Sequence, residues 1–424
     1  MDLAAVSFLL SQAGRAALDE LTQTPILPAN ELKLISSLRK RFDMTTTAAL
    51  IEAAQARQRA VRQRKYGRAD QMFFTRDGLE QSSGEVIANY RARRFVATMP
   101  KDARIADLCC GIGGDTIALA QYFDVTGFDL DETRLQLAHA NAHVCGVQDK
   151  LQVRQSDVTS FDGQAECAAK GNSSGDQSTT IKYDGVFFDP GRRDKNGKRI
   201  YDPERYSPPL STIRNWLKTT AGTAVKVSPG IDYEQLRAAG LDFEVEIISQ
   251  AGEVKEAVLW LGAFKRPEVA RRATLLQGDD VLSYDDAACI PDLPITTPRG
   301  YIHEPDGAII RAGLVGLLGE PLAATKIDPD IAYLTGDTPS DAVTARSFAV
   351  LDSMPFSLKK LKSSLQALKC GRVVVKKRGS PLSPEELIKA LAIKGDGKEL
   401  TVILTHLSGT HSAIICEEVK PSHS

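Results

Sequence analysis

The sequence predicts an α/β protein with a Rossmann-like sheet of seven strands, a helical N-terminal region and a smaller α/β domain at the C-terminal end. The chain has 424 residues, enough for two or three domains. From about residue 104, short apolar runs alternate with helical patterns, which is typical of a parallel sheet with crossover helices. A glycine-rich turn joins the first apolar run to a helical pattern, as in folds that bind a ligand at the sheet edge.

Residues 1–70 are predicted to form a helical domain, because Leu, Ile, Ala and Val recur there at helical spacing. Between residues 39 and 68 the sequence has nine Lys or Arg and only two Asp or Glu. Such a set fits either a solvated helix face or a face that contacts phosphates. We favour the solvated face.

Residues 71–265 are predicted to form the main α/β domain. Its strands are expected at residues 105–108, 125–128, 151–154, 185–188, 223–227, 243–248 and 257–264. Residues 163–182 are polar and rich in Gly, Ser and Thr, so we expect a surface loop there. Trp260 lies in an apolar run and is expected in the core.

Residues 270–424 are predicted to form a separate domain after a linker at 265–272. Strands are expected at 372–376, 400–404 and 412–417, and a helix is expected to begin in the segment 383–387. Between residues 359 and 398 the sequence has eleven Lys or Arg and three Asp or Glu. The overall net charge of -1 argues against indiscriminate nucleic-acid binding, but this stretch is a candidate basic patch.

The turn after the first strand predicts a nucleotide-like cofactor. Gly111, Gly113 and Gly114 let the backbone approach a ligand closely, and Cys109 lies in the same turn. The dinucleotide fingerprint requires a further glycine where Thr116 stands, which disfavours NAD. Asp107, four residues before the first glycine, instead suits a ligand with an ammonium group, as S-adenosylmethionine has.

Acids also follow the second and third predicted strands. Asp129, followed by Leu130, is placed to accept hydrogen bonds from both ribose hydroxyls. Asp157, followed by Val158, is placed where an adenine amino group is bound. Each acid alone fits an ordinary helix cap or turn, but the set with the glycine turn predicts an S-adenosylmethionine site.

The fourth strand leads into candidate acceptor-binding residues. Asp189 and Pro190 are expected to present a carboxylate and a carbonyl to a substrate N–H. Arg192 and Arg193 are expected to hold a phosphate through their planar guanidinium groups. The alternative is a turn with two solvated arginines.

Residues 74–95 are expected to form either a lid over the site or a plain helix with a polar face. The lid candidates are Thr75, Glu80, Gln81, Tyr90 and Arg91.

These motifs resemble class I S-adenosylmethionine-dependent methyltransferases related to trimethylguanosine synthase. The resemblance rests on DLCCGIGGDTIALA, FDLDE and FFDPGRRD, and on the preceding FFTRDGLEQSSGEVIANYRARRF. The C-terminal segments EPDGAIIRAGL, VVVKKRG and TVILTHLSGTHSAIIC resemble the THUMP-like domain of bacterial members. The resemblance implies a methyltransferase that acts on RNA, with a guanine amine as a possible target. Cap enzymes have a tryptophan after an Asp-Pro-Pro motif, where this chain has Gly191 and Arg192, so cap-type recognition is not expected.

We therefore expect a cytoplasmic methyltransferase that modifies an exocyclic or ring nitrogen of an RNA base. Lys376, Lys377 and Arg378 are expected to contact the RNA, and neither a membrane segment nor a metal site is expected. Two alternatives stay open. The enzyme acts on a small molecule or a protein, or the chain is a non-catalytic RNA-binding protein that keeps the methyltransferase fold.

Overall fold

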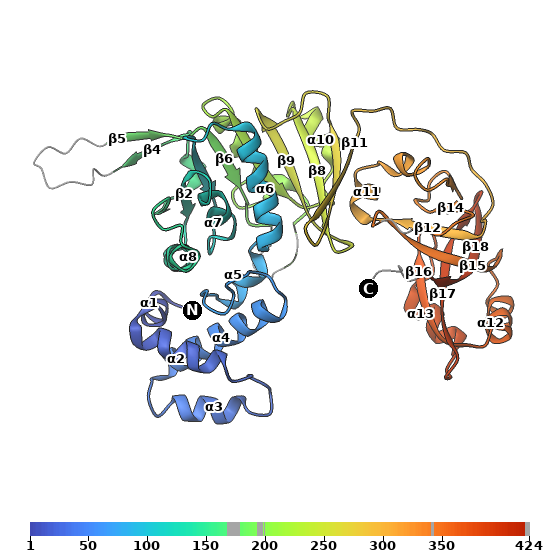
Figure 1. Cartoon of the computed structure of the whole chain (residues 1–424), viewed down its shortest axis with the longest axis horizontal. Coiled ribbons are helices and arrows are strands. Elements are labelled where there is room, and N and C mark those ends of the chain that lie inside the picture. Colours follow the sequence, from blue (N-terminus) through green and yellow to red (C-terminus); the bar gives the residue numbers. More distant parts are fainter. Residues whose placement is uncertain (168–178, 193–197, 199, 341–342, 420–424) are drawn as a thin grey trace, which may run out of the picture. The chain divides into compact units, whose positions relative to one another are not determined.

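The chain forms two compact units (Figure 1). The first unit comprises residues 1–243 and 258–266, and the second comprises residues 244–257 and the chain from 267 onward. The computed structural model describes residues 1–167, 179–192, 198, 200–340 and 343–419.

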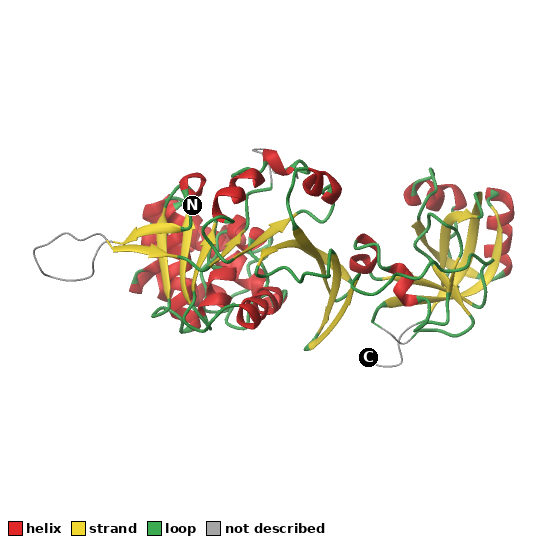
Figure 2. Ribbon diagram, turned by 90° about the horizontal axis from the view of Figure 1, so that it is seen from above, coloured by secondary structure: helices red, strands yellow, loops and turns green. Residues whose placement is uncertain are grey.

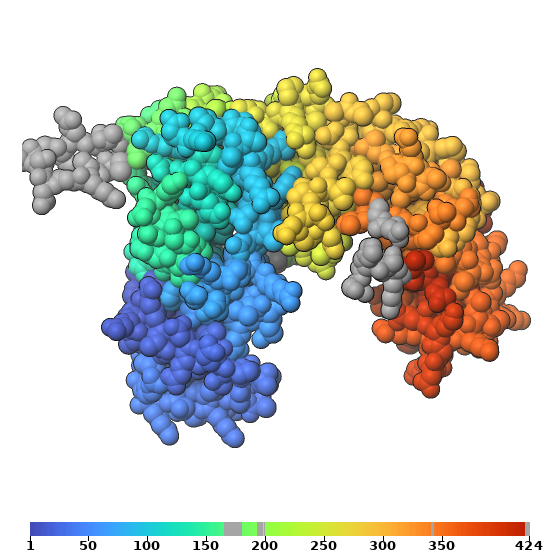
Figure 3. Space-filling model, viewed as in Figure 1, coloured from blue at the N-terminus to red at the C-terminus, as the bar shows by residue number. Residues whose placement is uncertain are grey.

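The predicted helical N-terminal region is present. It contains helices α1 (Leu3–Leu10), α2 (Gln12–Thr22), α3 (Glu31–Leu38) and α4 (Met44–Arg62). Asp2, Ser11 and Asp43 cap three of these helices by accepting a backbone N–H in the first turn. Figure 3 shows in blue the surface that these helices present. Arg57, from the basic stretch, is buried and ion-paired with Asp19 at 2.7 Å, so its role is structural.

All seven predicted strands of the main sheet are present, and two further strands extend it. The strands are β1 (Arg104–Leu108), β2 (Asp124–Asp129), β3 (Leu151–Gln155), β6 (Gly185–Phe188), β7 (Gly222–Val227), β8 (Phe243–Gln250), β9 (Glu253–Gly262), β10 (Arg271–Gln277) and β11 (Asp280–Asp285). Their order is β11-β10-β8-β9-β7-β6-β1-β2-β3. Strand β10 runs parallel to β8 and begins at Arg271, inside the predicted linker.

Helices follow or precede the strands of this sheet. They are α5 (Arg76–Gln81), α6 (Glu85–Thr98), α7 (Gly114–Ala120), α8 (Glu132–Cys145), α9 (Ile213–Trp216) and α10 (Tyr233–Ala238). Helix α8 packs on β2 and β3, and α6 packs on α7. Trp260 is fully buried beside Phe95 and Phe264, which confirms its predicted place in the core.

The predicted loop at 163–182 is partly wrong. Its ends pair as the antiparallel strands β4 (Gln164–Cys167) and β5 (Thr179–Lys182), drawn as yellow arrows in Figure 2. These two short strands are polar and have no alternating apolar pattern, so nothing in the sequence indicated that they pair. Residues 168–178 lie outside the described part of the chain.

The second unit contains a seven-stranded sheet of its own. Its order is β13-β14-β12-β15-β18-β17-β16, with β12 (Tyr301–Pro305), β13 (Thr325–Lys326), β14 (Leu334–Gly336), β15 (Ala345–Pro355), β16 (Cys370–Lys377), β17 (Lys398–Leu407) and β18 (Thr410–Glu418). Its helices are α11 (Gly307–Arg311), α12 (Leu358–Ala367) and α13 (Pro384–Leu391). Ser383 and Glu386 form a capping box at α13, where the sequence predicts a helix to begin. Leu361, Leu387 and Val402 belong to the core that joins α12 and α13 to the sheet.

Candidate active site

The predicted glycine turn after β1 has a left-handed backbone at three positions. Cys109, Gly111 and Gly113 have φ of 65°, 56° and 89°. A Cβ at Gly113 would lie 3.1 Å from the Cβ of Ala138 in α8, so the close approach of α8 also requires glycine there. A Cβ at Gly111 would meet no atom within 4 Å, so this side of the turn is open to a ligand. Gly114 begins α7.

Asp107 lies at the end of β1, and only one of its two carboxylate oxygens is hydrogen-bonded. Its side chain is 1% exposed, and its Oδ2 accepts a hydrogen bond from the Thr116 hydroxyl at 2.5 Å. Its Oδ1 has no hydrogen-bond partner among the residues that the structure describes. Burial, together with the nearby Asp115, raises the pKa of Asp107 well above its usual value. A cationic ligand near this strand end would offset that cost.

Asp129 ties the end of β2 to the glycine turn. Its Oδ2 accepts a hydrogen bond from the Gly111 N–H at 3.0 Å, and its Oδ1 accepts one from the Asp131 N–H at 3.0 Å. Each oxygen has a second acceptor position, so the carboxylate can still bind two hydroxyls. The Leu130 side chain that follows is 64% exposed at the same strand end.

Asp157 follows β3 and begins a short 3₁₀ turn. It accepts hydrogen bonds from the Thr159 N–H and hydroxyl at 2.9 and 2.8 Å, and these bonds lower its pKa. Val158 is buried beneath this turn. Strands β1, β2 and β3 are neighbours and parallel, so the three acids lie at one edge of the sheet, as the sequence predicts.

Asp189 follows β6 at the same edge, next to β1. Its backbone N–H donates to the Leu108 carbonyl at 3.2 Å, and its side chain is 21% exposed. Pro190 is buried, and Gly191 pairs with Ser207 through two backbone hydrogen bonds of 2.8 and 3.0 Å. The turn that presents Asp189 is therefore fixed on both sides.

Two cations lie beside Asp189. Arg192 is 3.9 Å away from its Oδ1, and Arg193 lies outside the described residues. The Lys226 ammonium of β7 is 2.6 Å from Oδ2, and sequence reasoning missed it. A lysine inside the buried run of β7 was the available signal, because a buried ammonium requires an anionic partner.

Lys226 belongs to a buried polar network that sequence reasoning also missed. Its ammonium donates to the Ser83 hydroxyl at 3.1 Å, and Arg91 donates to the same oxygen at 2.7 Å. Arg91 also forms an ion pair with Asp115 of α7. Burial opposes the charge on Asp115, but the Arg91 and Lys226 charges hold its pKa below the usual value. Arg91, a candidate lid residue, is therefore a buried structural link.

Two other lid candidates, Thr75 and Glu80, stabilise α5 and its contact with α4. Thr75 caps α5 by accepting the Gly78 N–H at 3.0 Å, and Glu80 pairs with Arg59 at 2.7 Å. A Cβ at Gly78 would come within 2.8 Å of the Ile112 side chain, so α5 lies directly on the turn.

The predicted RNA-contacting residues lie in the second unit, and two of them share an acid. Lys376 is ion-paired with Glu304 at 2.6 Å, and Arg378 lies 3.9 Å from the same side chain. Lys377 is exposed. Arg346 also reaches Glu304, at 4.0 Å, and pairs more closely with Glu418, so the cluster has three cations and two acids. The cluster keeps an excess of positive charge.

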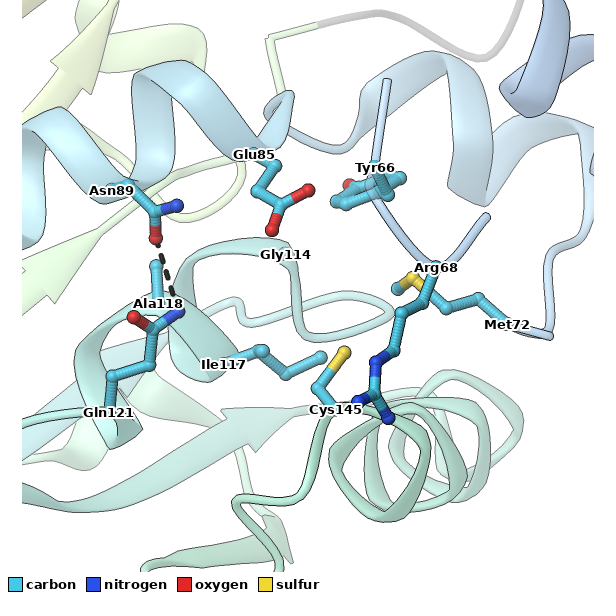
Figure 4. A pocket seen from close by; sticks show the side chains of 10 residues that line it. All are labelled: Tyr66, Arg68, Met72, Glu85, Asn89, Gly114, Ile117, Ala118, Gln121 and Cys145. Carbon is cyan, nitrogen blue, oxygen red and sulfur yellow. Dashed lines mark hydrogen bonds between the residues drawn. The ribbon is translucent and has the colours of Figure 1, made fainter. Parts of the chain in front are cut away.

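A small cavity of about 110 Å³ lies beside the start of α7 (Figure 4). It is lined by Tyr66, Arg68, Met72, Glu85, Asn89, Gly114, Ile117, Ala118, Gln121 and Cys145. Of the predicted cofactor residues, only Gly114 lines it. In Figure 4 the Asn89 and Gln121 amides close one side by a hydrogen bond of 3.2 Å.

The residues at the sheet edge fit S-adenosylmethionine. The unpartnered Asp107 oxygen, the open side of Gly111 and the spare acceptor positions of Asp129 suit an ammonium and ribose hydroxyls. In the described part of the chain, no group of three or more His, Cys, Asp or Glu side chains is arranged to hold a metal ion. The described helices include none with the length and apolar character needed to cross a membrane.

Three family comparisons match different parts of the chain. Residues 102–206 match the RNA cap guanine-N2 methyltransferase family, and residues 345–418 match the THUMP domain-like family. Residues 2–60 match a domain family of unknown function.

Individual proteins match over longer stretches. A crystal structure of a candidate methyltransferase from Porphyromonas gingivalis W83 has the same fold, with a TM-score of 0.69 over 99% of this chain and 98% of that one, at 20% identity. Trimethylguanosine synthase of Saccharomyces cerevisiae is 29% identical over 161 residues, 37% of this chain and 48% of that protein. An uncharacterized S-adenosylmethionine-dependent methyltransferase of Mycobacterium tuberculosis is 32% identical over 356 residues, 83% of this chain and 90% of that protein. The chain therefore belongs to the S-adenosylmethionine-dependent methyltransferases, with a domain of the RNA cap guanine-N2 methyltransferase type and a C-terminal THUMP-like domain.

Proposed function

We propose that this methyltransferase modifies an exocyclic or ring nitrogen of a base in RNA. The cofactor is held by the sheet-edge residues Asp107, Cys109, Gly111, Gly113, Gly114, Asp129, Leu130, Asp157 and Val158. Asp189 and Pro190 receive the acceptor nitrogen, and Arg192 and Arg193 hold an RNA phosphate.

In this proposal, alignment of the acceptor nitrogen with the methyl group accounts for most of the catalysis. Bound S-adenosylmethionine supplies an electrophilic methyl group, and its transfer is an in-line displacement that needs orientation and exclusion of water. Asp189 Oδ2 is held by Lys226, so Oδ1 is the oxygen left to accept a hydrogen bond from the N–H of the base that is methylated. The fixed turn at Gly191 keeps that oxygen in place.

The observation that carries the RNA assignment is the charge around Asp189. One carboxylate lies between the ammonium of Lys226 at 2.6 Å and the guanidinium of Arg192 at 3.9 Å. Because Asp189 is already paired with these two cations, a neutral base is favoured as the acceptor over the ammonium of a lysine side chain. The match of residues 102–206 to an RNA-modifying family supports the same substrate class.

The second unit supports RNA as the partner. The THUMP-like match covers β15 to β18, and the cations around Glu304 lie on this sheet. We propose that Lys376, Lys377 and Arg378 contact the RNA backbone. Lys376 must then give up part of its ion pair with Glu304 to bind a phosphate. Lys377 is exposed, and the described contacts include no ion pair between Lys377 and Glu304.

A labelling experiment tests the substrate class. Extract from a strain that lacks the gene is separated into RNA, protein and small-molecule fractions. Each fraction is incubated with the purified protein and methyl-labelled S-adenosylmethionine. Label in RNA, located by mass spectrometry of the nucleosides, is the expected result. Label confined to the protein or small-molecule fraction would reject RNA as the substrate.

A further inference from the structure

Lys226 is a lysine in an unusual place. It lies in β7, in a strand whose residues are all buried, and its own side chain is 5% exposed. An ammonium at such a position is costly unless it is paired and hydrogen-bonded. Lys226 meets both conditions, through Asp189 Oδ2 at 2.6 Å and the Ser83 hydroxyl at 3.1 Å.

This pair determines what the Asp189 carboxylate can do. With Oδ2 held by Lys226, rotation of the carboxylate is restricted and Oδ1 remains beside Arg192 at 3.9 Å. Without the lysine, the carboxylate would be free to rotate and would lose its closest counter-charge. The lysine therefore fixes the direction in which Oδ1 points.

The network also joins the acid to the glycine turn. Ser83 connects Lys226 to Arg91, and Arg91 pairs with Asp115 in the first turn of α7. Helix α7 directly follows the glycines of the turn. A chain of buried contacts thus runs from the predicted acceptor acid to the predicted cofactor turn.

We propose that Lys226 is a positioning residue, which holds Asp189 so that one carboxylate oxygen faces the acceptor nitrogen. The inference rests on the proposed function for the role of Asp189. Lys226 itself does not touch the reacting atoms. Lys226 affects methyl transfer through Asp189, and the hydrogen bond to Ser83 holds the Lys226 ammonium next to the acid.

Lys226→Met tests this role, with Lys226→Arg as the charge-conserving variant. The exposed Lys218, in the same unit, gives the matched control Lys218→Met. In Lys226→Met the affinity for S-adenosylmethionine should stay within about twofold, while the single-turnover rate near pH 7 falls by about tenfold or more. Lys226→Arg should recover part of the rate, and Lys218→Met should match the parent.

Rescue by the charge-conserving variant gives a readout that a merely structural role would not move. Among the described residues, Lys226 and Arg192 are the cations within 4.0 Å of the Asp189 carboxylate. Lys226→Arg restores a cation on the side of Oδ2, so it should recover turnover without a change in cofactor affinity. Rate and cofactor affinity that fall together in Lys226→Met, with no recovery in Lys226→Arg, would overturn the proposal.

A double-mutant cycle separates this inference from the substrate assignment. The effect of Lys226→Met on the rate and on the urea stability should be smaller in an Asp189→Asn background than in the parent. Equal effects in both backgrounds would overturn the positioning role. The rates are measured on whichever cell fraction the parent enzyme labels. Label outside RNA would therefore reject the proposed substrate and still leave the role of Lys226 decided by the cycle.

Discussion

Replacement of Asp129 by alanine is the sharpest test of the cofactor site. Asp129 is 6% exposed and accepts the backbone N–H groups of Gly111 and Asp131, each at 3.0 Å. In the proposed complex the same carboxylate also accepts the ribose hydroxyls. Its removal leaves ligand hydroxyls without an acceptor and releases the glycine turn from the end of β2.

The size of the effect follows from these lost partners. Leaving a buried polar group unpaired costs about 1–3 kcal/mol. If the ribose contacts account for that range, the dissociation constant for S-adenosylmethionine should rise roughly 5- to 150-fold. Isothermal titration calorimetry on the full chain measures this change directly.

Asp131→Ala is the matched control for this measurement. Asp131 is exposed two residues away, and its side chain caps α8 by accepting the Thr133 N–H at 2.8 Å. Loss of the cap should cost about 1 kcal/mol of stability and leave cofactor affinity within about twofold. If Asp129→Ala binds the cofactor as tightly as this control, the ribose assignment is wrong.

Three further outcomes are expected. Asp189→Asn should lower the single-turnover methylation rate and leave calorimetric cofactor affinity nearly intact; a parental rate would contradict the role of this acid. Joint replacement of Lys376, Lys377 and Arg378 by alanine should make the slope of log RNA affinity against log salt shallower, by about 0.7 per lost phosphate contact in filter binding; an unchanged slope would move RNA contact elsewhere. Burial lowers the pKa of His303 to about 4, below the usual 6.5, so stability is complete above pH 6.5 and falls as the pH drops toward 4. Between pH 7 and 4.5 this loss of stability is at most about 2–3 kcal/mol, and His303→Leu should reduce it in urea unfolding. The same pH dependence of stability in the variant and the parent would contradict the role of His303.

The main sheet could be predicted from the sequence because its strands are buried runs. Strand β6 is Gly185–Phe188 in both the prediction and the structure, and all four of its residues are buried. The capping box at Ser383 likewise marks the start of α13 in the sequence itself. In these cases the local pattern and the tertiary environment agree, so the pattern alone was sufficient.

The start of β10 could not be predicted, because the burial of Arg272 depends on charge pairing. Arg272 is 4% exposed in this strand and pairs with Glu244 of β8 at 2.7 Å. In the sequence the pair RR reads as part of a polar linker. Only the parallel register, which places Arg272 opposite Glu246 and near Glu244, supplies the partner that makes burial possible.

The acid–lysine pair of the active site joins two strands that the sequence does predict, but it depends on the exact register between them. Strands β6 and β7 are adjacent and parallel, with Phe188 opposite Val225. One residue further along each strand, Asp189 follows Phe188 and Lys226 follows Val225. Aligning the predicted runs 185–188 and 223–227 by their starts or by their ends places Asp189 opposite Val227 or Ser228, so only the observed register puts the acid beside the lysine. A lysine inside the apolar run of β7 indicates that a neighbouring element supplies an anionic partner, and the structure shows that this partner is Asp189 at the carboxyl edge of the sheet.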